Sequence, residues 1–194
     1  MTAESLEARL DAFEGVEAEP PRVARYAVGE AMIRNWAEAH DDTNPVYVDD
    51  AAARDTGRPG IVCPPAMIST WVMAGYRRHR EIHRMRAEGT VEDFAYSRLL
   101  RLLDEAGYTS VVATNVDQTY VREVRPGDRV SAHITIEAIS DVKNTALGQG
   151  RFLTLRKRYH DADGELLADE RFRLLRFKPG GGAGKRETER EDRA

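Results

Sequence analysis

The residues best suited to chemistry lie together in one short stretch, from Asp41 to Tyr47. The stretch reads Asp-Asp-Thr-Asn-Pro-Val-Tyr and is followed, ahead of an apolar segment, by Cys63-Pro64-Pro65. A carboxylate such as Asp42 can act as a general base towards water, and unpaired N–H groups at a helix start can stabilise a developing oxyanion. Asp42 and Asn44 also suit an Asx turn and a cap before Pro45. The stretch therefore has a catalytic and a structural interpretation.

Histidine and cysteine residues elsewhere are weaker candidates. His79 and His83 have the i, i+4 spacing of helical metal ligands, but Glu81 between them is misplaced for the His-Glu-x-x-His pattern. A solvated, charged helix end is the favoured interpretation, and we expect no metal site. Cys63 has no identifiable base and is expected to be a small buried residue. His40 precedes Asp42 by two residues and suits a helix C-terminus.

Composition limits the class of protein. The chain has 194 residues, 41 % of them apolar, which is enough for one domain with a sizeable core. The net charge of −4 lacks the basic surplus of a nucleic-acid-binding protein. The longest apolar run, Met67 to Tyr76, is shorter than the roughly 20 residues of a membrane span. A single cysteine excludes an internal disulfide framework, and we expect a cytoplasmic protein without a membrane partner.

The elements around the stretch must position it. Helical spacing of apolar residues predicts a helix over 29–40 and one long helix from Ala66 to a stop at Gly89. Shorter helices are expected near 49–54 and over 92–105. Alternating apolar residues with intervening turns then predict long antiparallel strands. These cover 109–124, 130–140, 150–160 and 166–177, with a weaker strand over 22–28.

The chain divides by composition into three parts. Residues 1–21 end at a Pro-Pro pair and are expected to be an arm, and residues 22–179 form the domain. Residues 180–194 begin with glycines and continue almost entirely with charged residues. Such a segment cannot bury apolar surface, so we expect a disordered tail or a truncated linker.

This order of elements resembles the hot-dog architecture, and the motifs resemble those of the MaoC-like family of R-specific enoyl-CoA hydratases and FAS1-like dehydratases. The family signature is Gly-Asp-x-Asn-Pro-x-His, with Ala-His-Gly before the central helix. Lys143-x-Thr145, Gly148-x-Gly150-x-Phe152-x-Thr154 and the run 172–177 look like the larger MaoC-like subunit of actinobacterial two-subunit steroid side-chain hydratases. The resemblance implies an α+β fold: a single hot-dog domain with a long antiparallel sheet wrapped around a central helix, plus a helical insert.

The resemblance also shows what is missing. In the family, Asp and His share the water, and amides near the central helix hold the thioester oxygen. Asp42 and Asn44 match the motif, but Tyr47 stands at the histidine position, and a phenol with a pKa of about 10 is no base at neutral pH. Pro64-Pro65 replaces His-Gly and removes amide donors. We therefore expect a vestigial motif and no catalytic residue in this chain.

Binding residues are expected elsewhere. The basic residues of 77–86 and of the hairpin around Lys143 and Arg151 could pair with CoA phosphates. Trp71 and Tyr76 could line a pocket for a bulky acyl group, although helical spacing also suits core packing. The substrate-binding candidates are therefore Trp71, Tyr76, Lys143 and Arg151.

The resulting hypothesis is an acyl-binding, non-catalytic subunit of a heteromeric enoyl-CoA hydratase for a bulky steroid side-chain substrate. A MaoC-like partner would supply Asp and His, and no cofactor is expected. The resemblance further implies an OB-like domain after this chain and an associated thiolase or aldolase. Three alternatives stay open: a homodimeric hydratase using Asp42 with Tyr47 or His40, a non-enzymatic acyl-CoA-binding or scaffolding module, and a thioesterase.

Overall fold

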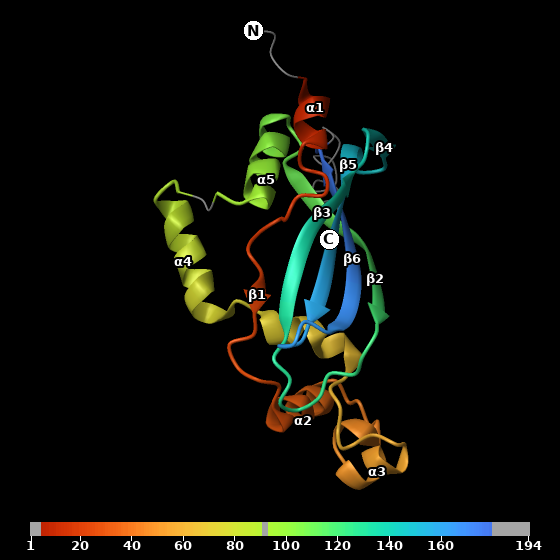
Figure 1. Cartoon of the computed structure of the whole chain (residues 1–194). Coiled ribbons are helices and arrows are strands. Elements are labelled where there is room, and N and C mark those ends of the chain that lie inside the picture. Colours follow the sequence, from red (N-terminus) through yellow and green to blue (C-terminus); the bar gives the residue numbers. More distant parts are fainter. Residues whose placement is uncertain (1–4, 91–92, 180–194) are drawn as a thin grey trace, which may run out of the picture.

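The computed structural model describes residues 5–90 and 93–179, so the predicted tail over 180–194 lies outside the described residues. Figure 1 shows a twisted sheet with helices at both of its ends. The helices are α1 (Leu6–Asp11), α2 (Glu30–Ala39), α3 (Asp50–Asp55), α4 (Gly75–Ala87) and α5 (Ala95–Glu105), with the 3-10 helices η1 (Pro45–Tyr47) and η2 (Pro65–Val72). The strands are β1 (Arg22–Val23), β2 (Ser110–Tyr120), β3 (Ser131–Ile139), β4 (Lys143–Thr145), β5 (Gly148–His160) and β6 (Leu166–Phe177).

The sheet is antiparallel with the order β1-β3-β5-β6-β2, and β4 pairs with β5. The four long strands predicted from alternation are confirmed, and β4 falls in the predicted loop between two of them. The strand predicted over 22–28 has only two residues. After Val23 the Ala24 and Val28 N–H groups donate to the Val130 and Asp128 carbonyls, which precede β3. Strand β2 therefore forms one edge of the sheet, and it has no strand on its outer side.

Two apolar clusters cover the inner face of the sheet. Near one end, η2 supplies Met67 and Ile68 to a cluster that includes Tyr159 of β5. Near the other end, α5 supplies Leu99 and Leu103 to a cluster that includes strand residues such as Leu153. Since Leu153 and Tyr159 are an even number of residues apart, both clusters lie on the same face of β5. The sheet thus curls around η2 and α5 together.

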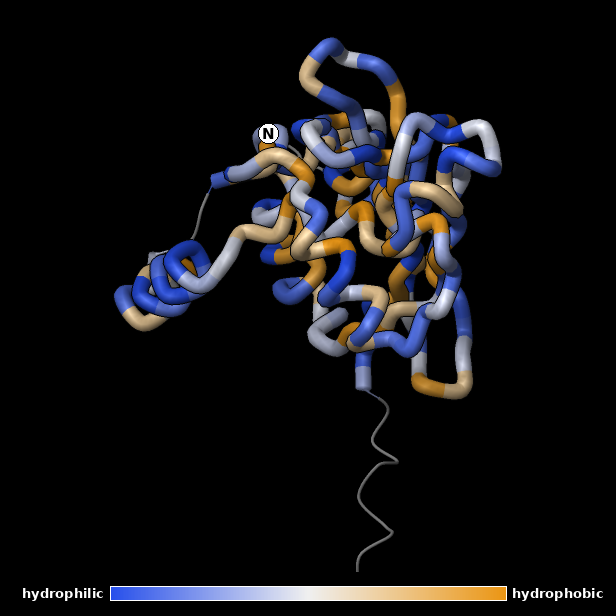
Figure 2. Tube along the Cα trace, turned by 90° about the horizontal axis from the view of Figure 1, so that it is seen from below, coloured by the Kyte–Doolittle hydropathy of each residue, from blue (hydrophilic) through white to orange (hydrophobic). Residues whose placement is uncertain are grey.

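The prediction of one long helix over 66–89 is wrong. Helix η2 ends at Val72, Met73 is extended with φ −64° and ψ 134°, and Gly75 takes a positive φ of 74°. Beyond Gly75 the sequence is mostly charged, and only a thin stripe of half-buried side chains, including Ile82, faces the body. Figures 1 and 2 show α4 standing apart from the sheet, with mainly hydrophilic residues. Too little apolar surface follows Gly75 to hold a continuous helix against the sheet.

The segment predicted to be an arm packs along β3. Gly15 donates its N–H to the Ile136 carbonyl at 2.8 Å, and Ala18 donates to Ile134 at 2.8 Å. Leu10 is buried beneath α5. These residues cover the β3 edge beyond the short β1. Within the described residues, no helix combines the length and apolar character that a membrane span requires.

Candidate functional site

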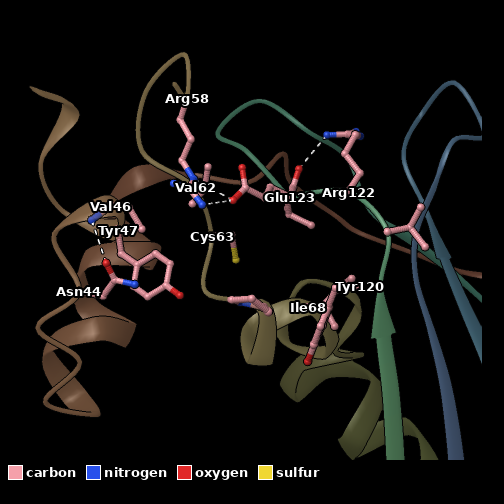
Figure 3. A pocket seen from close by; sticks show the side chains of 13 residues that line it. Asn44, Val46, Tyr47, Arg58, Val62, Cys63, Ile68, Tyr120, Arg122 and Glu123 are labelled. Carbon is pink, nitrogen blue, oxygen red and sulfur yellow. Dashed lines mark hydrogen bonds and ion pairs between the residues drawn. The ribbon is translucent and has the colours of Figure 1, made fainter. Parts of the chain in front are cut away.

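A cavity of about 240 Å³ lies where the Asp41–Tyr47 stretch meets the start of η2 and the end of β2. Figure 3 shows Tyr47 on one side, Tyr120 on the other, and the sulfur of Cys63 between them. The lining residues come from the stretch, the 58–65 segment, η2 and the chain from β2 to the next turn: Asn44, Val46, Tyr47, Arg58, Val62, Cys63, Pro65, Ile68, Tyr120, Val121, Arg122, Glu123 and Val124.

The Asp42 carboxylate and the Asn44 side-chain amide make turn and cap hydrogen bonds within the stretch. An Asp42 carboxylate oxygen accepts the Asn44 N–H at 3.1 Å. The Asn44 side-chain oxygen accepts the Val46 N–H at 3.3 Å and caps η1. Asn44 lines the cavity, whereas Asp42 is absent from its wall. The geometry therefore supports the structural interpretation of Asp42, and it leaves no carboxylate of the stretch facing the cavity.

Tyr47 is a hydrogen-bond donor rather than a base. Burial raises the pKa of its phenol above the ordinary value, and the nearby Asp42 charge raises the pKa further. The hydroxyl is therefore protonated at any pH near neutrality. It can donate a hydrogen bond into the cavity, but it cannot remove a proton from water there.

The start of η2 offers few amides for an oxyanion. Pro64 and Pro65 have no N–H group. The Cys63 N–H donates to the Val124 carbonyl at 2.8 Å, and the Met67 N–H donates to Pro64 at 3.0 Å. An anion at this helix start would therefore find those two amides already used. This helix start therefore has fewer free amide donors for an oxyanion than an ordinary helix start.

The thiol of Cys63 is buried and inert. It accepts a hydrogen bond from the indole N–H of Trp71 at 3.2 Å. Burial raises its pKa to about 11, so the nucleophilic thiolate is scarce at neutral pH. This matches the expected small buried residue.

Charged residues at the rim of the cavity were missed by sequence reasoning. The Arg58 guanidinium pairs with Glu123 at 2.6 Å. Beside it, Arg122 binds Asp128 at 3.0 Å and Asp161 at 2.7 Å and ties the end of β2 to two turns. No motif surrounds these residues in the sequence, because the 56–63 loop meets the end of β2 only in the folded chain.

A second polar group leads away from the cavity across the inner face of the sheet. The Tyr120 hydroxyl donates to the Gln118 side-chain oxygen at 2.5 Å, and Gln118 donates to Glu170 at 2.6 Å. Lys157 pairs with the same carboxylate at 2.6 Å, and the Tyr159 hydroxyl lies 3.3 Å from it. We call Gln118, Glu170 and Lys157 the polar row. Lys157 is one of the basic hairpin residues that the sequence suggested for CoA phosphates, whereas Gln118 and Glu170 were not predicted as site residues.

The four predicted substrate-binding residues do not come together. Trp71 is 8 % exposed and belongs to the core, while Tyr76 at the start of α4 is 75 % exposed. Lys143 lies on β4, exposed and at the opposite end of the sheet from α3. Arg151 is 2 % exposed, pairs with Glu7 and donates to the Ser140 carbonyl at 3.0 Å. Arg151 is thus engaged in packing α1, and the four residues lie in different parts of the fold.

The histidines also stay outside the cavity. His40 caps the end of α2, stacks on Trp36 with ring centroids 3.9 Å apart, and contacts the Trp36 carbonyl at 2.8 Å. His79 and His83 contact each other on α4 with centroids 4.3 Å apart. Among the described residues, no group of three His, Cys, Asp or Glu side chains is arranged to hold a metal ion.

Comparison with known proteins identifies a family and two similar curated proteins. The family of the FAS1-like dehydratase domain region matches residues 12–170. The chain is 45 % identical, over 92 % of its length, to a probable enoyl-CoA hydratase alpha subunit of Thermomonospora curvata, of which it covers 54 %. It is 44 % identical, over 83 % of its length, to the 3-oxo-4,17-pregnadiene-20-carboxyl-CoA hydratase alpha subunit of Mycobacterium tuberculosis, of which it covers 48 %. The chain therefore spans about half the length of these curated relatives.

A solved structure is similar to nearly the whole chain. One chain in the crystal structure of the ChsH1–ChsH2 complex from Mycobacterium tuberculosis superposes with a TM-score of 0.77 and 40 % identity. The match covers 92 % of this chain and 94 % of that one. The α+β hot-dog fold expected from the sequence is thereby confirmed.

Proposed function

Since this chain belongs to the FAS1-like dehydratase, MaoC-like hot-dog family, we propose that it is the acyl-binding, non-catalytic subunit of a heteromeric enoyl-CoA hydratase. The observation that carries the proposal is the phenol at position 47. Hydration of an enoyl thioester requires a base for water and donors for the thioester oxygen. The raised pKa of Tyr47, at the position of the family's histidine, and the prolines at the start of η2 support the proposal that this chain does not supply them.

A partner would supply the missing groups across the open edge of the sheet. Strand β2 is an edge strand of 11 residues. Its Val111 is 57 % exposed and its Val116 is 55 % exposed, and Val121, just after the strand, is 60 % exposed. A long apolar edge is rarely left free in a soluble protein. A second hot-dog domain with an intact Asp and His could pair with β2 and continue the sheet. The likeness to a chain from a two-protein complex supports such a partner.

The break after η2 favours a bulky acyl group. The inner face between η2 and α5 is not crossed by a continuous helix, because the chain turns outwards at Met73. The curated relative from Mycobacterium tuberculosis is named for a pregnadiene carboxyl-CoA. We therefore propose a steroid side-chain enoyl-CoA as substrate, with the thioester at the partner's Asp and His and the rings against this chain.

The test is turnover by the purified chain, the purified partner and the two together. The partner to try is a short hot-dog protein with an intact Asp and His, encoded beside this chain and co-expressed with it. Hydration by the mixture, with none by this chain alone, is expected. Robust turnover by this chain alone would overturn the proposal in favour of a homodimeric hydratase. Acyl-CoA binding without turnover in any combination would instead indicate a binding module.

A further inference from the structure

The polar row of Gln118, Glu170 and Lys157 lies on the inner face of the sheet, where apolar side chains would pack equally well. The strand register places the three residues side by side on β2, β6 and β5. Their row lies between the apolar cluster of η2 and that of α5. Removing an ion pair from water costs free energy that its Coulomb attraction often only balances. Packing alone therefore gives no reason for Lys157 and Glu170 at these positions.

The carboxylate of Glu170 and the ammonium of Lys157 differ in how many further hydrogen bonds they can make. The Glu170 side chain is 4 % exposed and receives hydrogen bonds from Lys157, Gln118 and Tyr159. The Lys157 ammonium has three N–H donors, and the ion pair occupies one of them. Its side chain is 23 % exposed, and its nitrogen lies 4.9 Å from the ring centroid of Phe172. Lys157 is thus fixed in direction by Glu170 and still accessible as a donor.

An apolar strip leads from the edge of the sheet to Lys157. Val116 is 55 % exposed, and it pairs in register with the half-buried Phe172, one step along the strands from the polar row. Both lie on the face of the sheet that carries the row, because their positions differ from Gln118 and Glu170 by two residues. Lys157 stands two strands in from the open edge, about 10 Å at the usual strand spacing. That distance suits a rigid ring system lying across β2 and β6.

The proposed function supplies such a ring system, and the following inference rests on it. We infer that the polar row is a specificity determinant, in which Lys157, held by Glu170, donates a hydrogen bond to a ketone oxygen at the far end of the bulky acyl group. A neutral acceptor suits the row because the carboxylate beside Lys157 repels an anion. A ketone is also preferred over a hydroxyl, since Glu170 already accepts three hydrogen bonds.

The experiment uses the complete complex with the partner and two substrates that share one ring skeleton, one with the distal ketone and one without it. The complex with the natural sequence is expected to prefer the ketone by about tenfold or more in kcat/KM, as one hydrogen bond from a charged donor provides. Lys157→Met should reduce kcat/KM for the ketone by that factor and leave the other substrate unchanged. Lys157→Gln, which keeps a neutral donor, should give an intermediate preference.

The control is Arg156→Met. Arg156 precedes Lys157 on the outer face of β5, where it pairs with Asp169 at 2.5 Å, so its loss removes a similar ion pair without touching the inner face. It should leave the ketone preference intact. The inference is overturned if the natural complex treats both substrates alike, or if Lys157→Met weakens both equally while the complex stays assembled. Failure of the natural complex to hydrate either substrate would instead contradict the proposed function.

Discussion

The Tyr120 hydroxyl donates a hydrogen bond of 2.5 Å to the Gln118 side chain and so joins the cavity beside Tyr47 to the polar row on the sheet. Both residues belong to the edge strand β2, whose outer side is open. A partner that pairs with β2 would therefore lie directly against Tyr120 and Gln118. The proposed surface for the partner and the proposed surface for the substrate would therefore be continuous.

Restoring the missing imidazole should not restore catalysis by itself. The Tyr47→His variant of the isolated chain is expected to show no hydration above background, because Pro64 and Pro65 still lack N–H groups for the thioester oxygen. Adding Pro64→His and Pro65→Gly restores the family's His-Gly pair ahead of η2 and should give the first detectable turnover. The readout is hydration of a short enoyl-CoA, with circular dichroism to confirm folding. Full activity in Tyr47→His alone would show that the amides at η2 are not limiting.

The buried thiol predicts how stability depends on pH. The folded-state pKa of Cys63 is about 11, above the ordinary value of 9.0, so the unfolded chain loses this proton first. The thiol's contribution is therefore complete below about pH 9 and is lost as the pH rises towards 11. Between pH 8 and pH 10 the natural chain should lose about 1 kcal/mol more free energy of unfolding than Cys63→Ala. Urea unfolding of the two proteins at both pH values measures this difference, and equal losses would contradict it.

Local patterns predicted much of the fold, whereas contacts made across the chain were not predictable. Alternation predicted the long strands, and the turn and cap hydrogen bonds of Asp42 and Asn44 match the structural interpretation of the Asp41–Tyr47 stretch. The end of η2 was missed because Met73 continues the helical spacing, and only the extended Met73 and the positive φ of Gly75 break it. The pairing of Arg58 with Glu123 depends on a loop meeting the segment just after β2, 65 residues further along the chain.

The same limit applies to the polar row. Lys157 and Glu170 are 13 residues apart, and only the β5–β6 register makes them neighbours. A basic residue within a charged strand looks like any other solvated side chain in the sequence. Burial is equally invisible in the sequence: Arg151, predicted to contact a ligand, is buried and pairs with Glu7 of α1.

Arg151 should matter for stability and not for substrate. Its guanidinium pairs with Glu7, binds the Ser140 carbonyl and lies 5.8 Å from the Tyr108 ring centroid. Arg151→Met is expected to cost about 2–3 kcal/mol, because three partners lose their contact in a buried site. Glu7→Gln should cost less, about 1 kcal/mol, since Glu7 is largely exposed and the other contacts stay.

Chemical denaturation measures both changes, and kinetics of the complex well below its unfolding temperature gives the second readout. The KM for the CoA substrate should be the same in Arg151→Met as in the natural sequence. A KM raised about tenfold, with little loss of stability, would return Arg151 to the substrate site.

The open edge of β2 should be the surface that recruits the partner. Val111→Glu together with Val121→Glu places two charges on residues that are 57 % and 60 % exposed, so the isolated chain should keep its fold and its free energy of unfolding within about 0.5 kcal/mol. The same charges would be buried and unpaired against a second sheet, so the affinity for the partner should fall at least a hundredfold.

Val142→Glu, on an exposed residue between β3 and β4, is the matched control and should bind normally. Light scattering and titration calorimetry of the three proteins with the partner decide the question. Unchanged binding by the double variant would place the interface on another face of the sheet.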